Sequence, residues 1–455
     1  MEKPEEGISL NNTEAFNNEK ALVKALRFQR IVNINMVRVF FLALISVSLI
    51  ALIPSVRPSY SVTEKRELHK FPDFSFRSLF SGGYFDDIGL WYSDTFPLRD
   101  SFVSINSKLT NLFGIKSVEI HGDVIKANAV PDSEAADNSS SDTEAVNVEP
   151  VPETIIEKIG AMAIIGDTGY EYYNFDKATA DSYIASINRA GELLSGKCRV
   201  FNMVVPTSIA VTLDEQVAAK IDSSDQKAAI DYIYTNISDN TVCVDCYNTL
   251  KKHKNEYIYF RTDHHWTALG AYYSYVNLMN AAGKTPADIS VFKQFVFEGF
   301  LGTFYTTSGM SQKLSATPDT VYAYEPPGIE YIHTYEVGFE KDYHIVSNAD
   351  KLSPSEKYLT FICGDHPLGV ITNEQITDNS ACLVIKESFG NPLAAYLTQN
   401  YHTVYVADCR KIKSVYSGNL ESFVAEHGIS DVFFVNNISA TRNRLIANCI
   451  ADFVG

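Results

Sequence analysis

The sequence predicts an α/β fold in which a mostly parallel sheet is covered by helices on both faces. Strand and helix patterns alternate along the last hundred residues, as they do in α/β proteins. The strand segments there are continuous apolar runs, which are typical of strands buried on both faces. The chain has 455 residues, of which 45% are hydrophobic and 12% aromatic, so its composition supports a large core.

The clearest elements lie between residue 381 and the end of the chain. Asn391 and Pro392 fit an N-cap followed by proline at the first helical position, and Gly428 fits a helix end. The expected strands are 381–385, 403–407 and 431–435, and the expected helices are 393–399, 420–427 and 442–453. Because a helix follows each strand, these strands are expected to lie parallel.

Elements of the same kind precede this region, within one domain expected over residues 154–455. Residues 285–355 within it are rich in glycine, threonine and tyrosine, and we interpret them as an inserted lobe or lid. Apolar runs predict strands at 161–165, 199–205, 241–244 and 257–260, and helical patterns cover 177–194, 214–237 and 268–282.

The N-terminal part predicts a membrane anchor. Residues 36–56 are almost continuously apolar, and the polar tail before them, residues 1–35, carries basic residues. The positive-inside rule places this tail in the cytoplasm and the rest of a single-pass cell-membrane protein outside. A buried core helix and a cleaved signal peptide are the alternatives. Residues 57–130 form an approach segment expected to pack on the domain, and residues 131–153 an acidic loop expected to be disordered.

Charge and cysteine content limit the classes of partner. The net charge of −17, without a basic stripe interleaved with aromatic residues, argues against a nucleic acid partner. Cys243 and Cys246 form a single CxxC pair, which could be a disulfide, half of a metal site or two ordinary cysteines. No second pair or group of histidines completes a metal site in the sequence, so ordinary cysteines are favoured and no cofactor is expected.

The segment 263–267, Asp-His-His-Trp-Thr, places polar chemistry between an expected strand and an expected helix. Active sites of open α/β sheets gather at such connections. Asp263 and His265 would project to the same side of an extended segment, with His264 pointing the other way. Asp263 could then hold His265 in one tautomer, as the acid of a Ser-His-Asp triad does. Trp266 either packs against the helix or offers its face to a sugar ring.

A second group of polar residues follows the C-terminal strands. Ser388 lies on a short turn after the first of them, where its hydroxyl could act as a nucleophile with His265 as its base. Gly390 would give this turn its conformational freedom. Asn436 and Asn437 follow the last strand and could donate a side-chain N–H to an oxyanion. Each feature alone is typical of an ordinary turn or cap, and only their joint placement favours a triad.

These residues resemble the DHHW protein family, because Asp263-His264-His265-Trp266 spells its name motif. DHHW proteins are similar to the alginate O-acetylation proteins, which have an SGNH-hydrolase-like fold with permuted motif order. The resemblance covers most of residues 57–455. Further stretches that look like family landmarks are Phe96–Asp100, Gly364–Pro367 and Glu387–Asn391.

The resemblance implies an SGNH-like catalytic domain over residues 154–455. Its acid, base and nucleophile would be Asp263, His265 and Ser388, and its oxyanion asparagine would be Asn436 or Asn437. One departure is Glu387, because the family usually has aspartate before the serine.

The implied activity is transfer of an acetyl group to a hydroxyl of a cell-envelope polysaccharide, through an acetyl-serine intermediate. The acetyl donor would be delivered outside the cell by a membrane-bound O-acyltransferase. Three alternatives remain at this point. The same triad could act as a carbohydrate esterase, the protein could be a non-catalytic glycan-binding component of an acetylation complex, or Asp263 and the two histidines could belong to a metal phosphoesterase with Asp408 as a further ligand.

Overall fold

The computed structural model describes residues 161–455 continuously, and before them residues 35–42 and short pieces between residues 57 and 131. Two compact units are present, Met1–Phe102 and Val103–Gly455, and the fold below is that of the second. None of the helices in the described part of the chain is long and apolar enough to cross a membrane. Most of the predicted anchor, residues 43–56, and nearly all of the predicted acidic loop lie outside the described residues.

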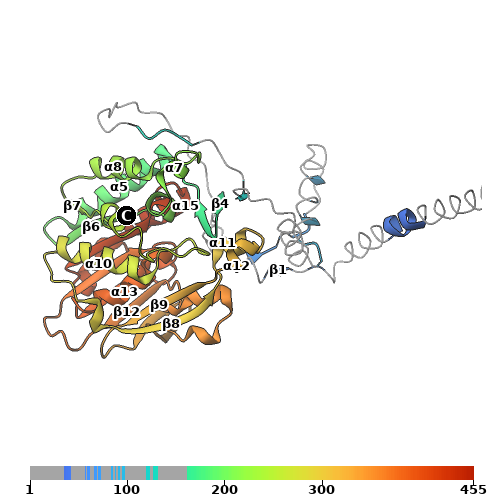
Figure 1. The fold of residues 1–455 in the computed structure, drawn as a ribbon. Helices are drawn as coiled ribbons and strands as arrows, with labels where there is room; N and C mark the ends of the chain where they lie inside the picture. The colour runs from blue at the N-terminus through green and yellow to red at the C-terminus, as the bar shows by residue number, and fades with distance from the viewer. Residues whose placement is uncertain are drawn as a thin grey trace, which may run out of the picture. The chain divides into compact units, whose positions relative to one another are not determined.

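An eight-stranded sheet forms the centre of the second unit (Figure 1). In spatial order its strands are β11 (Phe339–His344), β10 (Tyr331–Glu336), β12 (Leu368–Thr372), β14 (Thr403–Asp408), β13 (Ala381–Lys386), β15 (Asp431–Asn437), β6 (Arg199–Val205) and β7 (Thr241–Cys243). The five strands from β14 to β7 are parallel, and the other three are antiparallel to their neighbours. The prediction of a mixed α/β fold with a large sheet is therefore confirmed.

Helices cover both faces of this sheet, because its central strands are apolar on both sides. On β15, Phe433 belongs to one core and Phe434 to the other. The first core includes α10 (Ala268–Ala281) and α13 (Asn391–Leu397). The second core includes α5 (Lys177–Leu194), α8 (Gln226–Thr235), α14 (Leu420–His427) and α15 (Arg444–Val454).

The region predicted as an inserted lobe, residues 285–355, forms two separate parts of the fold. Its first part forms a hairpin of β8 (Lys293–Phe300) and β9 (Asp319–Glu325), with α11 (Thr303–Thr307) and α12 (Gln312–Ser315) between them. Its second part, β10 and β11, extends the main sheet. The 3-10 helices η3 (Ala349–Lys351) and η4 (Pro354–Thr360) follow.

Two expected elements differ from the structure. The helix expected over 214–237 is broken into α7 (Glu215–Ala218) and α8, because the Asp225 carboxylate caps a new helix at Lys227 and Ala228. The strand expected at 257–260 does not join the sheet. Tyr259 instead pairs with Trp266 in an isolated bridge, so this segment closes a loop on itself.

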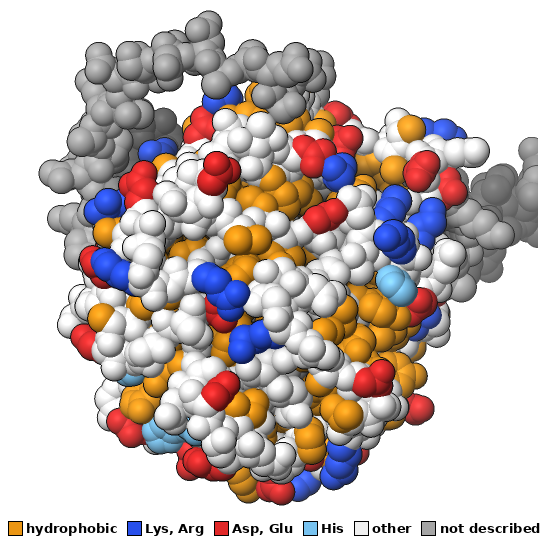
Figure 2. All heavy atoms as spheres, turned by 90° about the vertical axis from the view of Figure 1, so that its left-hand side faces the viewer, with side chains coloured by type: hydrophobic (Ala, Val, Ile, Leu, Met, Phe, Trp, Pro, Cys, Tyr) orange, Lys and Arg blue, Asp and Glu red, His pale blue; other side chains and the backbone are white. Residues whose placement is uncertain are grey.

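A smaller antiparallel sheet precedes the main one and consists of β3 (Glu119–His121), β4 (Met162–Ile165) and β5 (Thr168–Glu171). The face of the molecule drawn in Figure 2 carries side chains of both charges. On the face drawn in Figure 2, basic and acidic side chains are interspersed, and no continuous basic surface is seen there.

Candidate active site

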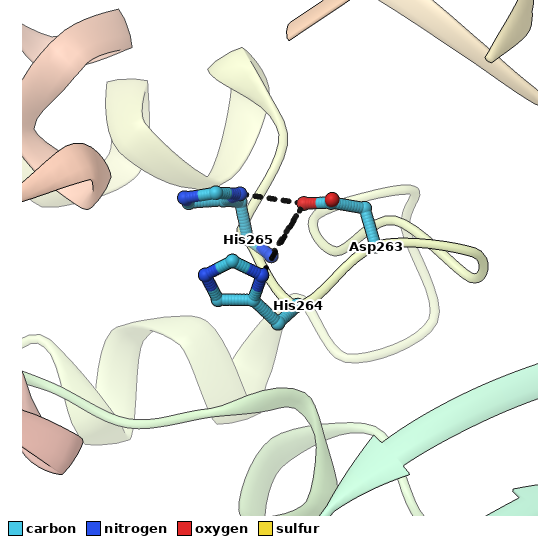
Figure 3. Close-up of side chains that lie close together, drawn as sticks. All are labelled: Asp263, His264 and His265. Carbon is cyan, nitrogen blue, oxygen red and sulfur yellow. Dashed lines mark hydrogen bonds and ion pairs between the residues drawn. The ribbon is translucent and has the colours of Figure 1, made fainter. Parts of the chain in front are cut away.

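Asp263 and His265 lie together on the loop that precedes α10 (Figure 3). The Nδ1 atom of His265 is 2.5 Å from Oδ1 of Asp263, and the main-chain N–H of His265 donates to the same oxygen at 3.0 Å. Asp263 is 2% exposed and His265 is 5% exposed. The predicted pairing of this carboxylate with this imidazole is therefore present.

The loop reaches this geometry without being an extended strand. Its two ends are joined by hydrogen bonds from Phe260 N to His265 O and from Thr267 N to Ile258 O. Thr267 caps α10 by accepting a hydrogen bond from Gly270 N. Because the intervening residues form a succession of bends, the side of each side chain is set by the loop and not by strand alternation.

A buried carboxylate of β9, Asp319, anchors this loop from outside. It accepts hydrogen bonds from the main-chain N–H groups of Arg261 and Thr262 at 2.6–3.0 Å. It also accepts from the hydroxyls of Thr262 and Tyr257, both at 2.6 Å. Since Asp319 is fully buried, these four donors supply the polar partners that its charge requires.

The second oxygen of Asp263 is held by the start of α11. Oδ2 accepts from the main-chain N–H of Thr303 at 2.8 Å and from its hydroxyl at 2.9 Å. A Cβ atom at Gly302 would overlap the Asp263 carboxylate, so this position requires glycine. Gly302 and Thr303 therefore leave Oδ1 directed at His265.

His264 lies against His265 instead of pointing away, which corrects the expectation from strand geometry. The two ring centroids are 3.8 Å apart with an interplanar angle of 39° (Figure 3). Nδ1 of His264 is 2.7 Å from the Thr303 hydroxyl. Because that hydroxyl gives its single proton to Asp263, we infer that His264 Nδ1 carries a proton and donates it to Thr303. His264 thus orients the Thr303 hydroxyl, which donates to Asp263 Oδ2.

Ser388 approaches His265 from the sheet. It follows the central strand β13 and begins the 3-10 helix η5 (Ser388–Gly390). Its Oγ lies 2.7 Å from Nε2 of His265, within hydrogen-bond range. Since β13 ends at this point, the sequence places a hydroxyl at the carboxyl edge of the parallel block, where α/β proteins hold their sites.

The residue before the serine supports the turn. Both carboxylate oxygens of Glu387 accept main-chain hydrogen bonds, from Phe389 N at 2.8 Å and from Asn437 N at 2.6 Å. Oε2 of Glu387 also lies 3.3 Å from the Ser388 hydroxyl. The side chain that departs from the family pattern therefore fixes the nucleophile turn to the end of β15.

The residues on both sides of the turn belong to one buried ionic network. Lys386 has no exposed surface, and its Nζ bonds to Asn391 Oδ1 at 2.6 Å and to Asp365 Oδ1 at 3.0 Å. Arg410 bonds to Asp365 and to Asp408. Asn391 is therefore a network member inside α13 and not the expected N-cap, a position that Gly390 occupies.

Gly390 is required for space and not for an unusual backbone conformation. Its φ as the cap of α13 is −71°, an angle that any residue can adopt. A Cβ atom there would lie 2.5 Å from Cβ of Lys386. Its N–H donates to the Glu387 carbonyl at 3.0 Å, so this group closes the turn.

Trp266 connects the loop that carries His265 to the turn that carries Ser388, from the interior of the protein. Its indole N–H donates to the carbonyl of Phe389 at 2.8 Å, and the side chain has no exposed surface. The structure thus places it beneath the nucleophile turn and leaves no face of the indole on the surface for a sugar.

The two asparagines at the end of β15 point to opposite faces of the sheet. Asn436 is fully buried, and its Oδ1 lies 3.4 Å from the hydroxyl of Tyr183, a residue of the second core. Asn437 donates from its side chain to Val205 O at 3.3 Å and caps the next turn at Ser439 N. The hydrogen bonds of these side chains are therefore made elsewhere. Neither asparagine is held at the Ser388 hydroxyl, where an oxyanion donor was expected.

Asp263, His264 and His265 bring possible ligand atoms within 4.8 Å of one another, a spacing that a metal ion could also bridge. Their hydrogen bonds explain the arrangement without an ion, because each Asp263 oxygen already accepts two of them. Asp408, the further ligand considered from the sequence, is paired with Arg410. Cys243 and Cys246 are free cysteines in this structure.

The electrostatics of the site favour an ionised Asp263. Burial acts to raise the pKa of this carboxyl group, but the two neighbouring imidazoles and the hydrogen bonds from His265 and Thr303 outweigh it and lower the pKa well below its usual range. An ionised Asp263 accepts only, so His265 Nδ1 carries a proton and Nε2 can accept one from Ser388. This arrangement can activate a serine hydroxyl for attack on a carbonyl.

Similarity to known proteins identifies the family of this chain. The family model of the DHHW proteins matches residues 64–156 and 142–407. No curated protein matches the chain. A crystal structure of a DHHW family protein from Eubacterium siraeum shares 28% identity, with a TM-score of 0.57, over 66% of this chain and 98% of the other.

More distant solved structures are also similar to this chain. PatB1 of Bacillus cereus is 17% identical with a TM-score of 0.52, over 61% of this chain and 95% of the other. The O-acetyltransferase domain of Pseudomonas putida AlgJ, 12% identical over 62% and 95% of the two chains, has a TM-score of 0.35, which is too low for an inference. The family match spans more than half of the sequence and includes the Asp-His-His-Trp loop of the site, so the chain belongs to the DHHW protein family.

Proposed function

We propose that this protein is an O-acetyltransferase that modifies a cell-envelope polysaccharide outside the cell membrane. Ser388 is the nucleophile, His265 the general base and acid, and Asp263 the residue that orients His265. The observation that supports this proposal most directly is the continuous series of hydrogen bonds, 2.5 Å from Asp263 to His265 and 2.7 Å from His265 to Ser388. The second distance lies within the range expected for a serine and its base.

The proposed reaction has two halves. In the first, Oγ of Ser388 attacks the carbonyl carbon of an acetyl ester while Nε2 of His265 takes the hydroxyl proton. The donor alkoxide leaves with that proton, and acetyl-serine remains. In the second, His265 removes a proton from a sugar hydroxyl, the sugar oxygen attacks the acetyl carbonyl, and Ser388 leaves with the proton restored.

The apolar segment and the family resemblance support the proposed setting of the reaction. In this proposal residues 36–56 anchor the chain, with residues 1–35 in the cytoplasm and the domain outside. Because acetyl-CoA is not expected outside the membrane, a membrane-bound O-acyltransferase would deliver the acetyl group. An SGNH-like fold of the domain is part of the same proposal.

The test uses the full-length protein with p-nitrophenyl acetate as donor and an oligosaccharide as acceptor. We expect mass spectrometry to detect acetylated oligosaccharide with the wild type and none with Ser388→Ala. Ser414→Ala, at an exposed hydroxyl outside the site, is the matched control and should retain the wild-type rate.

The outcomes of this test separate the alternatives. Free acetate without acetylated sugar, still dependent on Ser388, would identify a carbohydrate esterase that uses water as acceptor. Turnover of the donor that is unchanged in Ser388→Ala would refute catalysis by this site. A glycan-binding role in an acetylation complex would then be the better proposal.

A further inference from the structure

Tyr358 contacts both reacting partners of the proposed site from a separate element. It lies on η4, in the segment between β11 and β12. Its ring is stacked on the His265 ring, with centroids 3.9 Å apart and an interplanar angle of 14°. Its hydroxyl donates to the main-chain carbonyl of Ser388 at 3.0 Å. One side chain therefore touches the base through its face and the nucleophile turn through its hydroxyl.

The stacked ring has a different effect on the two protonation states of His265. The face of a tyrosine ring carries negative electrostatic potential, so it favours the imidazolium over the neutral imidazole. His265 becomes an imidazolium when it takes the proton of Ser388. The contact should therefore lower the energy of the charge that develops during attack.

Other groups also face His265 and enter the same balance. Asp263 bonds to its Nδ1, His264 lies against its ring, and Glu387 lies one contact further, beside the Ser388 hydroxyl. Asp263 stabilises the imidazolium by its negative charge. Two other rings lie against His265, those of His264 and Phe389, and they are tilted by 39° and 45° to its plane. Tyr358, at 14°, is stacked more nearly parallel to the His265 ring than either of them.

The hydroxyl of Tyr358 distinguishes this contact from simple packing. Packing of the ring against Phe361, at 5.1 Å between centroids, needs no hydroxyl. The bond to the Ser388 carbonyl fixes the distance between the ring that supports the base and the turn that carries the nucleophile. The segment that includes η4 thus contacts both the base and the nucleophile turn through Tyr358.

We propose that Tyr358 is a positioning residue for acyl transfer, an inference that rests on the proposed function. Its ring holds the plane of the His265 imidazole and stabilises its protonated form, and its hydroxyl holds the Ser388 turn at the matching distance.

The test measures reaction of Ser388 with phenylmethylsulfonyl fluoride, which requires no acetyl donor or acceptor. Ser388 Oγ attacks the sulfur, fluoride leaves, and the hydroxyl proton passes to His265. The labelling rate of the full-length protein is followed by intact mass between pH 5 and 9 in the wild type, Tyr358→Phe and Tyr358→Leu. Tyr331→Leu, at an exposed tyrosine on β10, is the control.

We expect the two variants to differ in the pH dependence. Tyr358→Phe keeps the ring, so the midpoint of the profile should stay in place while the rate falls by about threefold to tenfold through loss of one hydrogen bond. Tyr358→Leu loses the ring, so the midpoint should move to lower pH by about half a unit, because neutral His265 is reached earlier.

Three outcomes would overturn the inference or one part of it. If the wild type is labelled at Ser388 but Tyr358→Leu keeps the wild-type rate and midpoint, Tyr358 has no positioning role while the proposed function stands. If the wild type is not labelled at Ser388, the activated serine is absent and both proposals fail. Should Tyr358→Leu not fold, an unchanged rate in Tyr358→Phe would refute the role of the hydroxyl.

Discussion

Ser388 and His265 are 2.7 Å apart, but the fold holds them by different means. Ser388 extends from β13, a central strand that is paired in parallel on both sides and buried along its whole length. His265 lies on a loop outside the sheet. That loop is held by the Asp319 carboxylate, which accepts from Thr262 N, and by Asp263, which accepts from the main-chain N–H and the hydroxyl of Thr303. One half of the site is thus positioned by backbone pairing and the other by a few buried polar contacts.

This difference predicts where the site is most sensitive to single substitutions. The strand half distributes its support over many main-chain bonds, so a change at one side chain should affect folding more than geometry. The loop half depends on individual carboxylates and hydroxyls, so a change there should affect geometry and activity while the fold persists.

The largest effect on activity is expected for Asp263→Asn in the loop half. An asparagine can present an N–H to His265 Nδ1 and so favour the wrong tautomer, which in serine triads costs about 10⁴-fold in rate. The acetyl transfer assay above measures this loss, and thermal unfolding should show a folded protein. Asp342→Asn, at an exposed carboxylate on β11, is the matched control and should be fully active.

A loss of less than tenfold in Asp263→Asn would contradict the assignment of Asp263 as the orienting acid. It would also remove the main support for treating the loop as the sensitive half of the site.

The largest effect on stability is expected for Lys386→Met in the strand half. This lysine is fully buried between Asp365, Asp408 and Asn391, and removing one member of a buried ionic network typically costs about 3–5 kcal/mol. Urea unfolding measures the change in free energy. Lys413→Met, at an exposed lysine, should change it by less than about 0.5 kcal/mol. A small effect of Lys386→Met would mean that the network is not needed to hold the turn.

An intermediate effect on activity is expected at Thr303. Two substitutions at this position distinguish the effect of the hydroxyl from the effect of side-chain size. Thr303→Val keeps the size but removes the bond to Asp263 Oδ2, so we expect a fall in kcat of about tenfold to a hundredfold. Thr303→Ser keeps the hydroxyl and should restore most of the rate. Steady-state kinetics distinguishes this result from a packing effect, in which the valine variant would be the more active of the two.

The same contrast explains what the sequence could predict. Strands β6, β13, β14 and β15 were predicted within two residues at each end, because each is a continuous apolar run and that signal is local. Ser388 was placed correctly at the end of β13 for the same reason. The pairing of Asp263 with His265 was anticipated from a strand that does not form, so the expected contact is present but the assumed backbone is not.

The residues that complete the loop half could not be found in this way. Thr303, Asp319 and Tyr358 lie 38 or more positions from His265 in the sequence, and nothing in their own neighbourhood marks them as partners of a buried loop. The single local signal is the glycine at 302, whose requirement becomes apparent only when the approach of Asp263 is seen. The assignment of oxyanion donors to Asn436 and Asn437 met the same limit, because residue order does not show which side-chain bonds are already made.

The smallest effect is expected in the acid dependence of stability that Asp263 gives to the loop half. The pKa of Asp263 is lowered in the folded protein, because its imidazole neighbours and hydrogen bonds outweigh its burial. The contribution of this carboxylate to the free energy of unfolding is therefore fully present above the pKa of the unfolded state, near 3.9. It is lost as the pH falls below that value towards the pKa of Asp263 in the folded protein. Asp263→Asn lacks this carboxyl group, so below about pH 4 its free energy of unfolding should fall less steeply than that of the wild type, by up to about 1.4 kcal/mol per pH unit. Urea unfolding at pH 3 and 6 measures the difference, and parallel curves would show that Asp263 is not ionised in the folded loop.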